Sequence, residues 1–100
     1  MIKVVYNDNF NNLKITGHAG YADKGKDIVC ASASSIILSS INLAIEFNKD
    51  VKYTDNLNKI EVINNTNDEN VTKVFSNMIT CLQDLEKQYP DNIKISKGDK

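Results

Sequence analysis

The rarest reactive side chains of this sequence are one histidine, His18, and two cysteines, Cys30 and Cys81. A cysteine thiolate is a strong nucleophile near neutral pH, and a histidine within hydrogen-bond reach can activate it and later protonate a leaving group. His18 and Cys30 stand at the two ends of one segment, residues 18–30, whereas Cys81 follows much later among apolar residues. The first two residues are therefore the candidate catalytic pair, and Cys81 is expected to pack in the core as a small hydrophobe.

The segment between these two residues has the composition of a surface loop. Gly20 and Gly25 interrupt any apolar periodicity. Lys24 and Lys26 add charges that prefer water. We expect residues 19–26 to form a lid that becomes ordered when a peptide binds. Alanine at both glycines should leave stability nearly unchanged if neither glycine needs a positive φ.

Asp27 marks the start of the helix that carries Cys30. Its carboxylate can accept hydrogen bonds from the backbone N–H groups two and three residues on, which makes it a suitable N-cap and places Cys30 in the first helical turn. There the macrodipole and the free N–H groups of the helix favour the thiolate. Asp27 could also orient the imidazole of His18, but its role as a cap already explains it. Ser34, one turn further on the same face, could reach the site, although a hydrogen bond back to the carbonyl of Cys30 is the simpler expectation.

Hydrophobic periodicity predicts five short strands and two helices. Alternation with period two marks the strands, and apolar residues at helical spacing mark the helices. A pattern of the capping-box type at 66–69 precedes the second helix, and Pro90 ends it. The expected elements are strands at 2–6 and 13–16, a helix from Ile28 to about Asn48, strands at 51–54 and 60–63 around a turn at 55–58, a helix that ends at Tyr89, and a strand at 93–95. This predicts an α+β fold, with two helices packed on a small, mostly antiparallel sheet in the order ββαββαβ.

Composition limits the other classes of function. One hundred residues suit a single domain, residues 1–100. The formal charge is −1 and all twelve basic residues are lysine, so the guanidinium groups that read phosphate and guanine are lacking and no direct contact with nucleic acid is expected. No signal peptide and no run of about 18 apolar residues is evident, which favours a cytoplasmic location without membrane contact. Because the sequence has neither a Cys-x-x-Cys motif nor a pair of histidines, we expect no metal and no other cofactor.

The sequence resembles the ribosomal-processing cysteine protease family, called Prp, in the strings Gly17-His18-Ala19 and Asp27-Ile28-Val29-Cys30-Ala31, followed by Ser34. The two motifs and their spacing carry the resemblance, and the ββαββαβ order extends it in pattern over most of the domain. The resemblance implies that His18 and Cys30 are the catalytic dyad of an endopeptidase. It also implies that this endopeptidase removes a short N-terminal extension from a large-subunit ribosomal protein in support of ribosome assembly, and that it forms a homodimer.

Two other classes of function remain open from the residues alone. A noncatalytic, ribosome-associated peptide-binding module would use the same groove without needing the sulfur, so Cys30→Ser would leave its function intact. A thiol redox sensor would need an exposed, reactive Cys30 and a resolving partner, for which Cys81 is the candidate in this sequence.

Overall fold

The computed structural model describes residues 1–23, 25–56 and 58–98. Within these ranges the chain forms five strands and two helices in the predicted order ββαββαβ. They are β1 (Ile2–Tyr6), β2 (Asn12–Thr16), α1 (Ile28–Phe47), β3 (Val51–Asn56), β4 (Lys59–Asn64), α2 (Glu69–Gln88) and β5 (Ile93–Lys97). Lys24 and Leu57, which the sequence assigns to the loop and to a turn, lie outside the described residues.

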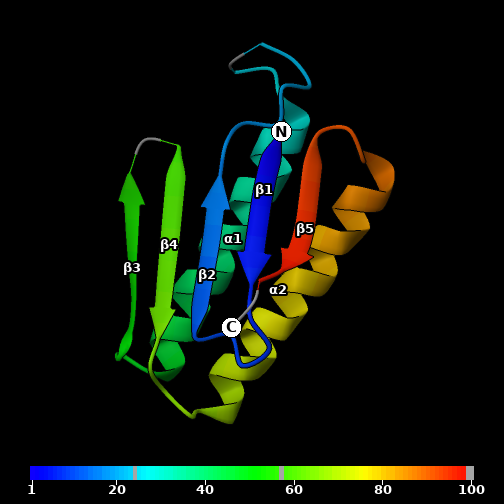
Figure 1. The fold of residues 1–100 in the computed structure, drawn as a ribbon. Coiled ribbons are helices and arrows are strands. Elements are labelled where there is room, and N and C mark those ends of the chain that lie inside the picture. Colours follow the sequence, from blue (N-terminus) through cyan, green and yellow to red (C-terminus); the bar gives the residue numbers. More distant parts are fainter. Residues whose placement is uncertain (24, 57, 99–100) are drawn as a thin grey trace.

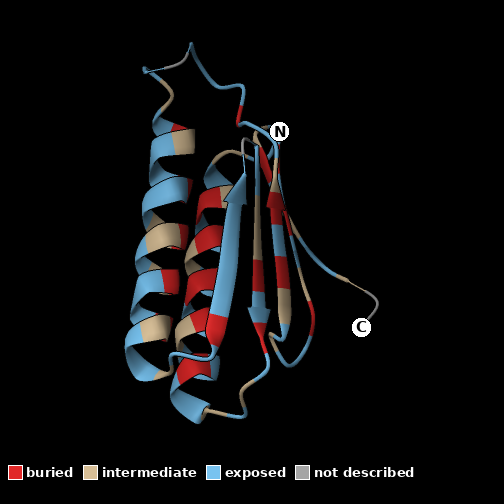
Figure 2. Cartoon of the chain, turned by 90° about the vertical axis from the view of Figure 1, so that its left-hand side faces the viewer, coloured by how far each residue is buried: buried red, intermediate tan, exposed pale blue. Residues whose placement is uncertain are grey.

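The strands form one mixed sheet with the order β3-β4-β2-β1-β5. The pairs β1/β2, β2/β4 and β3/β4 are antiparallel, and β1/β5 is parallel. Figures 1 and 2 show both helices on the same face of the sheet, with the opposite face uncovered. The prediction of an α+β fold with a mostly antiparallel sheet is therefore confirmed.

The core lies between the sheet and the two helices. Inward positions of β1 and β2 are buried and apolar, as expected for strands that pack on one side and meet water on the other. Burial of one such side chain contributes about 1.5–3 kcal/mol, so this layer supplies most of the driving force for folding. The helices contribute Val29, Ala33, Ile37, Ile41 and Ala44 from α1, and Val71, Phe75, Met78, Ile79, Leu82 and Leu85 from α2.

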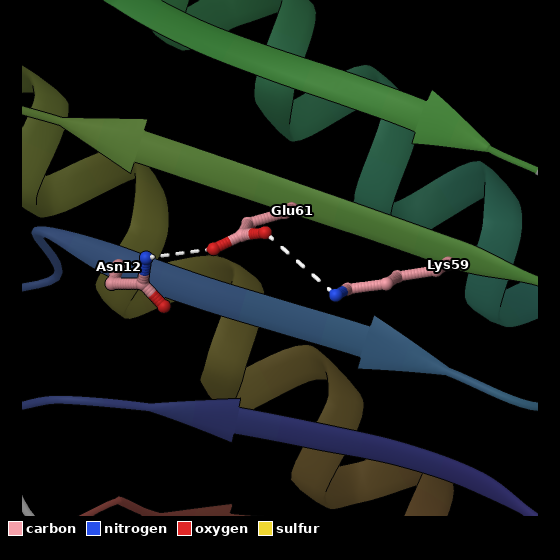
Figure 3. A network of polar contacts seen from close by, with 3 residues as sticks. All are labelled: Asn12, Lys59 and Glu61. Carbon is pink, nitrogen blue, oxygen red and sulfur yellow. Dashed lines mark hydrogen bonds and ion pairs between the residues drawn. The ribbon is translucent and has the colours of Figure 1, made fainter.

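The uncovered face of the sheet carries polar cross-strand contacts. The Asn12 side chain on β2 donates to Oε2 of Glu61 on β4 at 3.2 Å, and Nζ of Lys59 lies 3.9 Å from Oε1 of the same carboxylate (Figure 3). Such exposed pairs are each worth less than about 1 kcal/mol, so they help to fix the register of β2 and β4 more than they stabilise the fold.

Two boundaries differ from the sequence prediction. Asp55 and Asn56, expected in a turn, extend β3 because they pair with β4. The capping box is also wrong, since the N-cap of α2 is Asp68, whose carboxylate accepts the N–H of Asn70 at 2.8 Å. Thr66 instead donates its hydroxyl hydrogen to Oδ1 of Asn64, a side chain that is almost fully buried. This local bond takes Thr66 away from the helix and moves the helix start.

By length and composition α1 is a helix that could cross a membrane. In the structure its buried face packs against the sheet and against α2 (Figure 2). The core helix of a water-soluble protein passes the same test of length and composition, so the finding is weak evidence for a membrane span.

The chain brings several element ends to one end of the molecule, the upper end in Figure 1. The end of β2, the start of α1, the end of α2 and the starts of β1 and β5 all lie there, below the projecting loop between β2 and α1. Side chains from residues far apart in the sequence can therefore meet at this end.

Candidate active site

Cys30 lies in the first turn of α1, as the sequence predicts. Asp27 is the N-cap, and Oδ1 of its carboxylate accepts the backbone N–H groups of Val29 and Cys30, each at 3.0 Å. The interpretation of Asp27 as a cap is confirmed. The sulfur of Cys30 therefore lies at the positive end of the helix, in a half-buried position at the edge of the core.

The Cys30 sulfur accepts a hydrogen bond from the backbone of the loop. The donor is the N–H of Ala19, and the distance from nitrogen to Sγ is 3.2 Å. This N–H belongs to the peptide bond between His18 and Ala19, so the contact fixes the histidine backbone beside the sulfur. A donated N–H favours the thiolate in the same way as the helix N-terminus does.

Gly17 turns the chain from β2 towards His18. It adopts a φ of +87°, and a Cβ at this position would overlap the carbonyl oxygen of Met1. Its N–H donates to the carbonyl oxygen of Asn58 at 3.1 Å. Only glycine combines this backbone conformation with so close an approach of a neighbouring strand, which explains why glycine precedes the histidine.

Asp27 also anchors the loop with its second carboxylate oxygen. Oδ2 accepts the N–H groups of Tyr21 at 3.1 Å and Ala22 at 3.4 Å. Hydrogen bonds from the backbone, chiefly the one from Cys30, hold the pKa of the Asp27 carboxyl below its ordinary value of 3.8. The carboxylate thus ties the loop to the helix start, and it accepts hydrogen bonds from four backbone N–H groups rather than from His18.

The C-terminal end of α2 holds the loop from the other side. The rings of Tyr21 and Tyr89 meet edge to face with their centroids 5.3 Å apart. The side-chain amide of Asn92 donates to the carbonyl oxygen of Ala19 at 3.0 Å. Gly20 and Gly25 both adopt positive φ, so the condition under which alanine would be harmless at these two positions is not met.

A cavity of about 870 Å³ opens beside the sulfur. Both His18, which is exposed, and Cys30 line it, and both also line a smaller adjoining cavity. This volume is in the range of sites that hold small ligands or a short stretch of peptide. The walls include loop residues on one side and Ile28 and Ser34 of α1 on the other.

Ser34 and Cys81 differ from their sequence interpretation. Ser34 is exposed and lines the cavity, and among the described residues the serine that bonds back along α1 is Ser39, whose hydroxyl donates to the carbonyl of Ser35 at 2.6 Å. Cys81 is half-buried on α2 rather than fully buried in the core.

Three residues at the site have roles that were not predicted from the sequence. Ala19 supplies the N–H to the sulfur, Asn92 holds the Ala19 carbonyl, and Asn58 lines both cavities. Ala19 belongs to the Gly17-His18-Ala19 motif, but no sequence signal indicates the contacts of these three residues, because each acts through its backbone or from an element distant along the chain.

Comparison with known proteins identifies the class and the family. The family model described as cysteine protease Prp matches residues 1–94. The ribosomal processing cysteine protease Prp of Mycoplasma genitalium is 35% identical, over 97% of this chain and 96% of its own length. The protein of the same name from Staphylococcus aureus is 32% identical, over 80% of this chain and 79% of its own length.

Solved structures agree with the sequence matches. The Staphylococcus aureus protease Prp with a covalently linked product peptide superposes with a TM-score of 0.82 at 28% identity, and the match covers 97% of each chain. The same protease with a substrate peptide gives a TM-score of 0.76 at 26% identity. The protein described here is therefore a cysteine protease. It belongs to the Prp family of ribosomal processing cysteine proteases.

Proposed function

We propose that this protease removes the short N-terminal extension of a large-subunit ribosomal protein, with Cys30 as nucleophile and His18 as its acid and base. One observation carries the assignment: the Cys30 sulfur lies at a helix start, accepts the N–H that follows His18, and faces a cavity that His18 also lines. The proposal takes residues 1–100 as one catalytic domain in the cytoplasm, without a cofactor.

The reaction follows from these positions. The Cys30 thiolate attacks the carbonyl carbon of the scissile peptide bond, and the imidazolium of His18 protonates the leaving amine as the bond breaks. A thioester to Cys30 remains. Neutral His18 then takes a proton from water as the water oxygen attacks the thioester carbon, and the C–S bond breaks to release the acid product and restore the Cys30 thiolate and the His18 imidazolium.

The substrate assignment rests on the relatives and on the shape of the site. The similar proteins are named for ribosomal processing, and those from Staphylococcus aureus are described with substrate and product peptides. An N-terminal extension is a flexible peptide that can enter an open cavity of this size.

Incubation with the extended ribosomal protein of the same organism tests the substrate. Mass spectrometry should show the mature protein and the released peptide, with no cleavage by Cys30→Ala. A full-length ribosomal protein after long incubation with an active-site-titrated enzyme would contradict the assignment.

Cys30→Ser separates this proposal from a noncatalytic binding module. The variant replaces sulfur by oxygen at nearly constant shape, so it should still bind the extended ribosomal protein but lose turnover. Retention of the cellular function by the serine variant would instead support a binding role.

We further propose that two copies of the chain associate through the outer face of α1. Leu43 and Phe47, four residues apart on this helix, are 49% and 50% exposed, and the only charged residue of α1 is Glu46. Two large apolar side chains exposed side by side can form the centre of a contact between copies. Leu43→Asp should therefore give a monomer in sedimentation experiments, and an unchanged molecular mass would exclude this surface.

A further inference from the structure

Asn92 is held rigidly in the turn between α2 and β5. Its N–H donates to the carbonyl oxygen of Tyr89 at 3.0 Å, and its own carbonyl oxygen accepts the N–H of Ile2 at 2.9 Å. The N–H of Ile93 also reaches the Tyr89 carbonyl oxygen, at 3.3 Å. The backbone of Asn92 therefore joins the end of α2 to the first residue of β1, and its side chain extends from a fixed base.

That side chain reaches the residue that contacts the sulfur. Nδ2 of Asn92 lies 3.0 Å from the carbonyl oxygen of Ala19, and the nitrogen of Ala19 lies 3.2 Å from Sγ of Cys30. Ala19 is 2% exposed, so its carbonyl is largely shielded from water. The N–H and the carbonyl group of Ala19 are attached to the same Cα. A fixed direction of the Ala19 carbonyl therefore limits the directions in which the Ala19 N–H can point.

We propose that Asn92 is a positioning residue of the protease, which aims the N–H of Ala19 at the Cys30 sulfur and holds the adjoining His18 backbone in place. The inference rests on the proposed role of Cys30 as the nucleophile.

The backbone around Ala19 explains why such an anchor is needed. Gly17, before the segment 18–19, is held by its N–H bond to Asn58, but Gly20, after it, has a positive φ and open space around it, so it constrains the Ala19 carbonyl weakly. The carboxylate of Asp27 fixes the loop only from Tyr21 onwards. Without the Asn92 amide the Ala19 carbonyl has lost its partner, and rotation towards water would carry the neighbouring N–H away from the sulfur.

The pH dependence of Cys30 alkylation measures this contact directly. Iodoacetamide labelling, with mass spectrometry to separate Cys30 from Cys81, is compared for the wild type, Asn92→Ala and Asn92→Leu. Leucine nearly keeps the branched shape and size of asparagine but has neither a hydrogen-bond donor nor a charge. In both variants the hydrogen bond from the Ala19 N–H to the Cys30 thiolate is weakened. The pH at which alkylation of Cys30 reaches half its maximal rate should therefore rise by about half to one unit.

Asn48→Ala is the matched control. Asn48 is also a half-buried asparagine whose Nδ2 donates across the fold, to Oδ2 of Asp68 at 3.4 Å, but it lies at the far end of α1 from Cys30. The Asn48→Ala substitution should lower the melting temperature without moving the midpoint of Cys30 alkylation. On a peptide substrate, Asn92→Ala should lower kcat about five- to tenfold with little change in KM, since the lost bond acts on the reacting sulfur rather than on the bound peptide.

The outcomes separate the positioning role from a structural one. A shifted midpoint in folded Asn92→Leu, with the Asn48→Ala profile unchanged, supports the proposal even if Asn92→Ala does not fold. Unchanged midpoints in folded Asn92 variants overturn it. If the wild type cleaves no peptide, the proposed function fails, and the alkylation profiles still decide whether Asn92 acts on the Cys30 sulfur.

Discussion

Gly17→Ala should be among the most damaging single-methyl changes in this protein. Gly17 has a φ of +87°, and the new Cβ would overlap the carbonyl oxygen of Met1. This oxygen belongs to a backbone peptide that cannot rotate away, because the N–H of the same peptide, on Ile2, is bonded to the Asn92 carbonyl at 2.9 Å. Relief therefore requires β1 to move away from the end of β2.

Two costs add in this variant. A non-glycine residue in the left-handed region costs about 1–2 kcal/mol. Forcing a methyl group into filled space costs about 1–3 kcal/mol more. The total of about 2–5 kcal/mol corresponds to a fall in melting temperature of about 10–30 °C for a domain of this size. Since the whole stability of such a domain is about 5–15 kcal/mol, the variant should still fold at low temperature.

Gly25→Ala is the control because it isolates the backbone strain. Gly25 also has a φ of +87°, but nothing lies within 4 Å of a Cβ there. The free energy of unfolding of Gly25→Ala should fall only by the cost of the left-handed conformation, about 1–2 kcal/mol. Urea unfolding of the wild type and both variants gives the two differences in the free energy of unfolding. If Gly17→Ala and Gly25→Ala lose the same amount, the close approach to Met1 does not contribute and the reasoning is wrong.

Three further predictions concern the site. His18→Ala should slow alkylation of Cys30 markedly at mildly acidic pH, because an imidazolium partner stabilises the thiolate there; an unchanged profile would mean that the two side chains are not coupled. Backbone N–H groups, chiefly that of Cys30, keep the pKa of Asp27 below 3.8, so the stability that its carboxylate gives is present above pH 3.8 and is lost as the pH falls through the lower folded-state value. Asp27→Asn should remove this acid-dependent part from pH-dependent melting curves, and an identical acid response in both proteins would contradict it. Amide hydrogen exchange in the loop after Ala19 should slow when a peptide binds Cys30→Ala, and equal protection in both states would show that the loop is preformed rather than a lid.

The sequence alone determined the parts of the structure that depend on neighbouring residues. Asp27 and Cys30 were placed correctly because an N-cap bonds to N–H groups two and three residues away, within one turn of chain. The element order followed from apolar periodicity, which is also local. Thr66 shows the limit of such patterns, because its hydroxyl bonds to the side chain of Asn64 and the N-cap of α2 is Asp68 instead.

Only the tertiary structure decided how the thiol is surrounded. The parallel pairing of β5 with β1 brings Asn92 to Ala19, and the turn at Gly17 brings Ala19 to the Cys30 sulfur. Asn92 and Ala19 are far apart in the sequence. The periodicity or the cap of one segment does not indicate where another segment will lie in the fold. Their meeting depends on the packing of the whole sheet and both helices, because that packing alone sets the distance between groups that are remote in sequence.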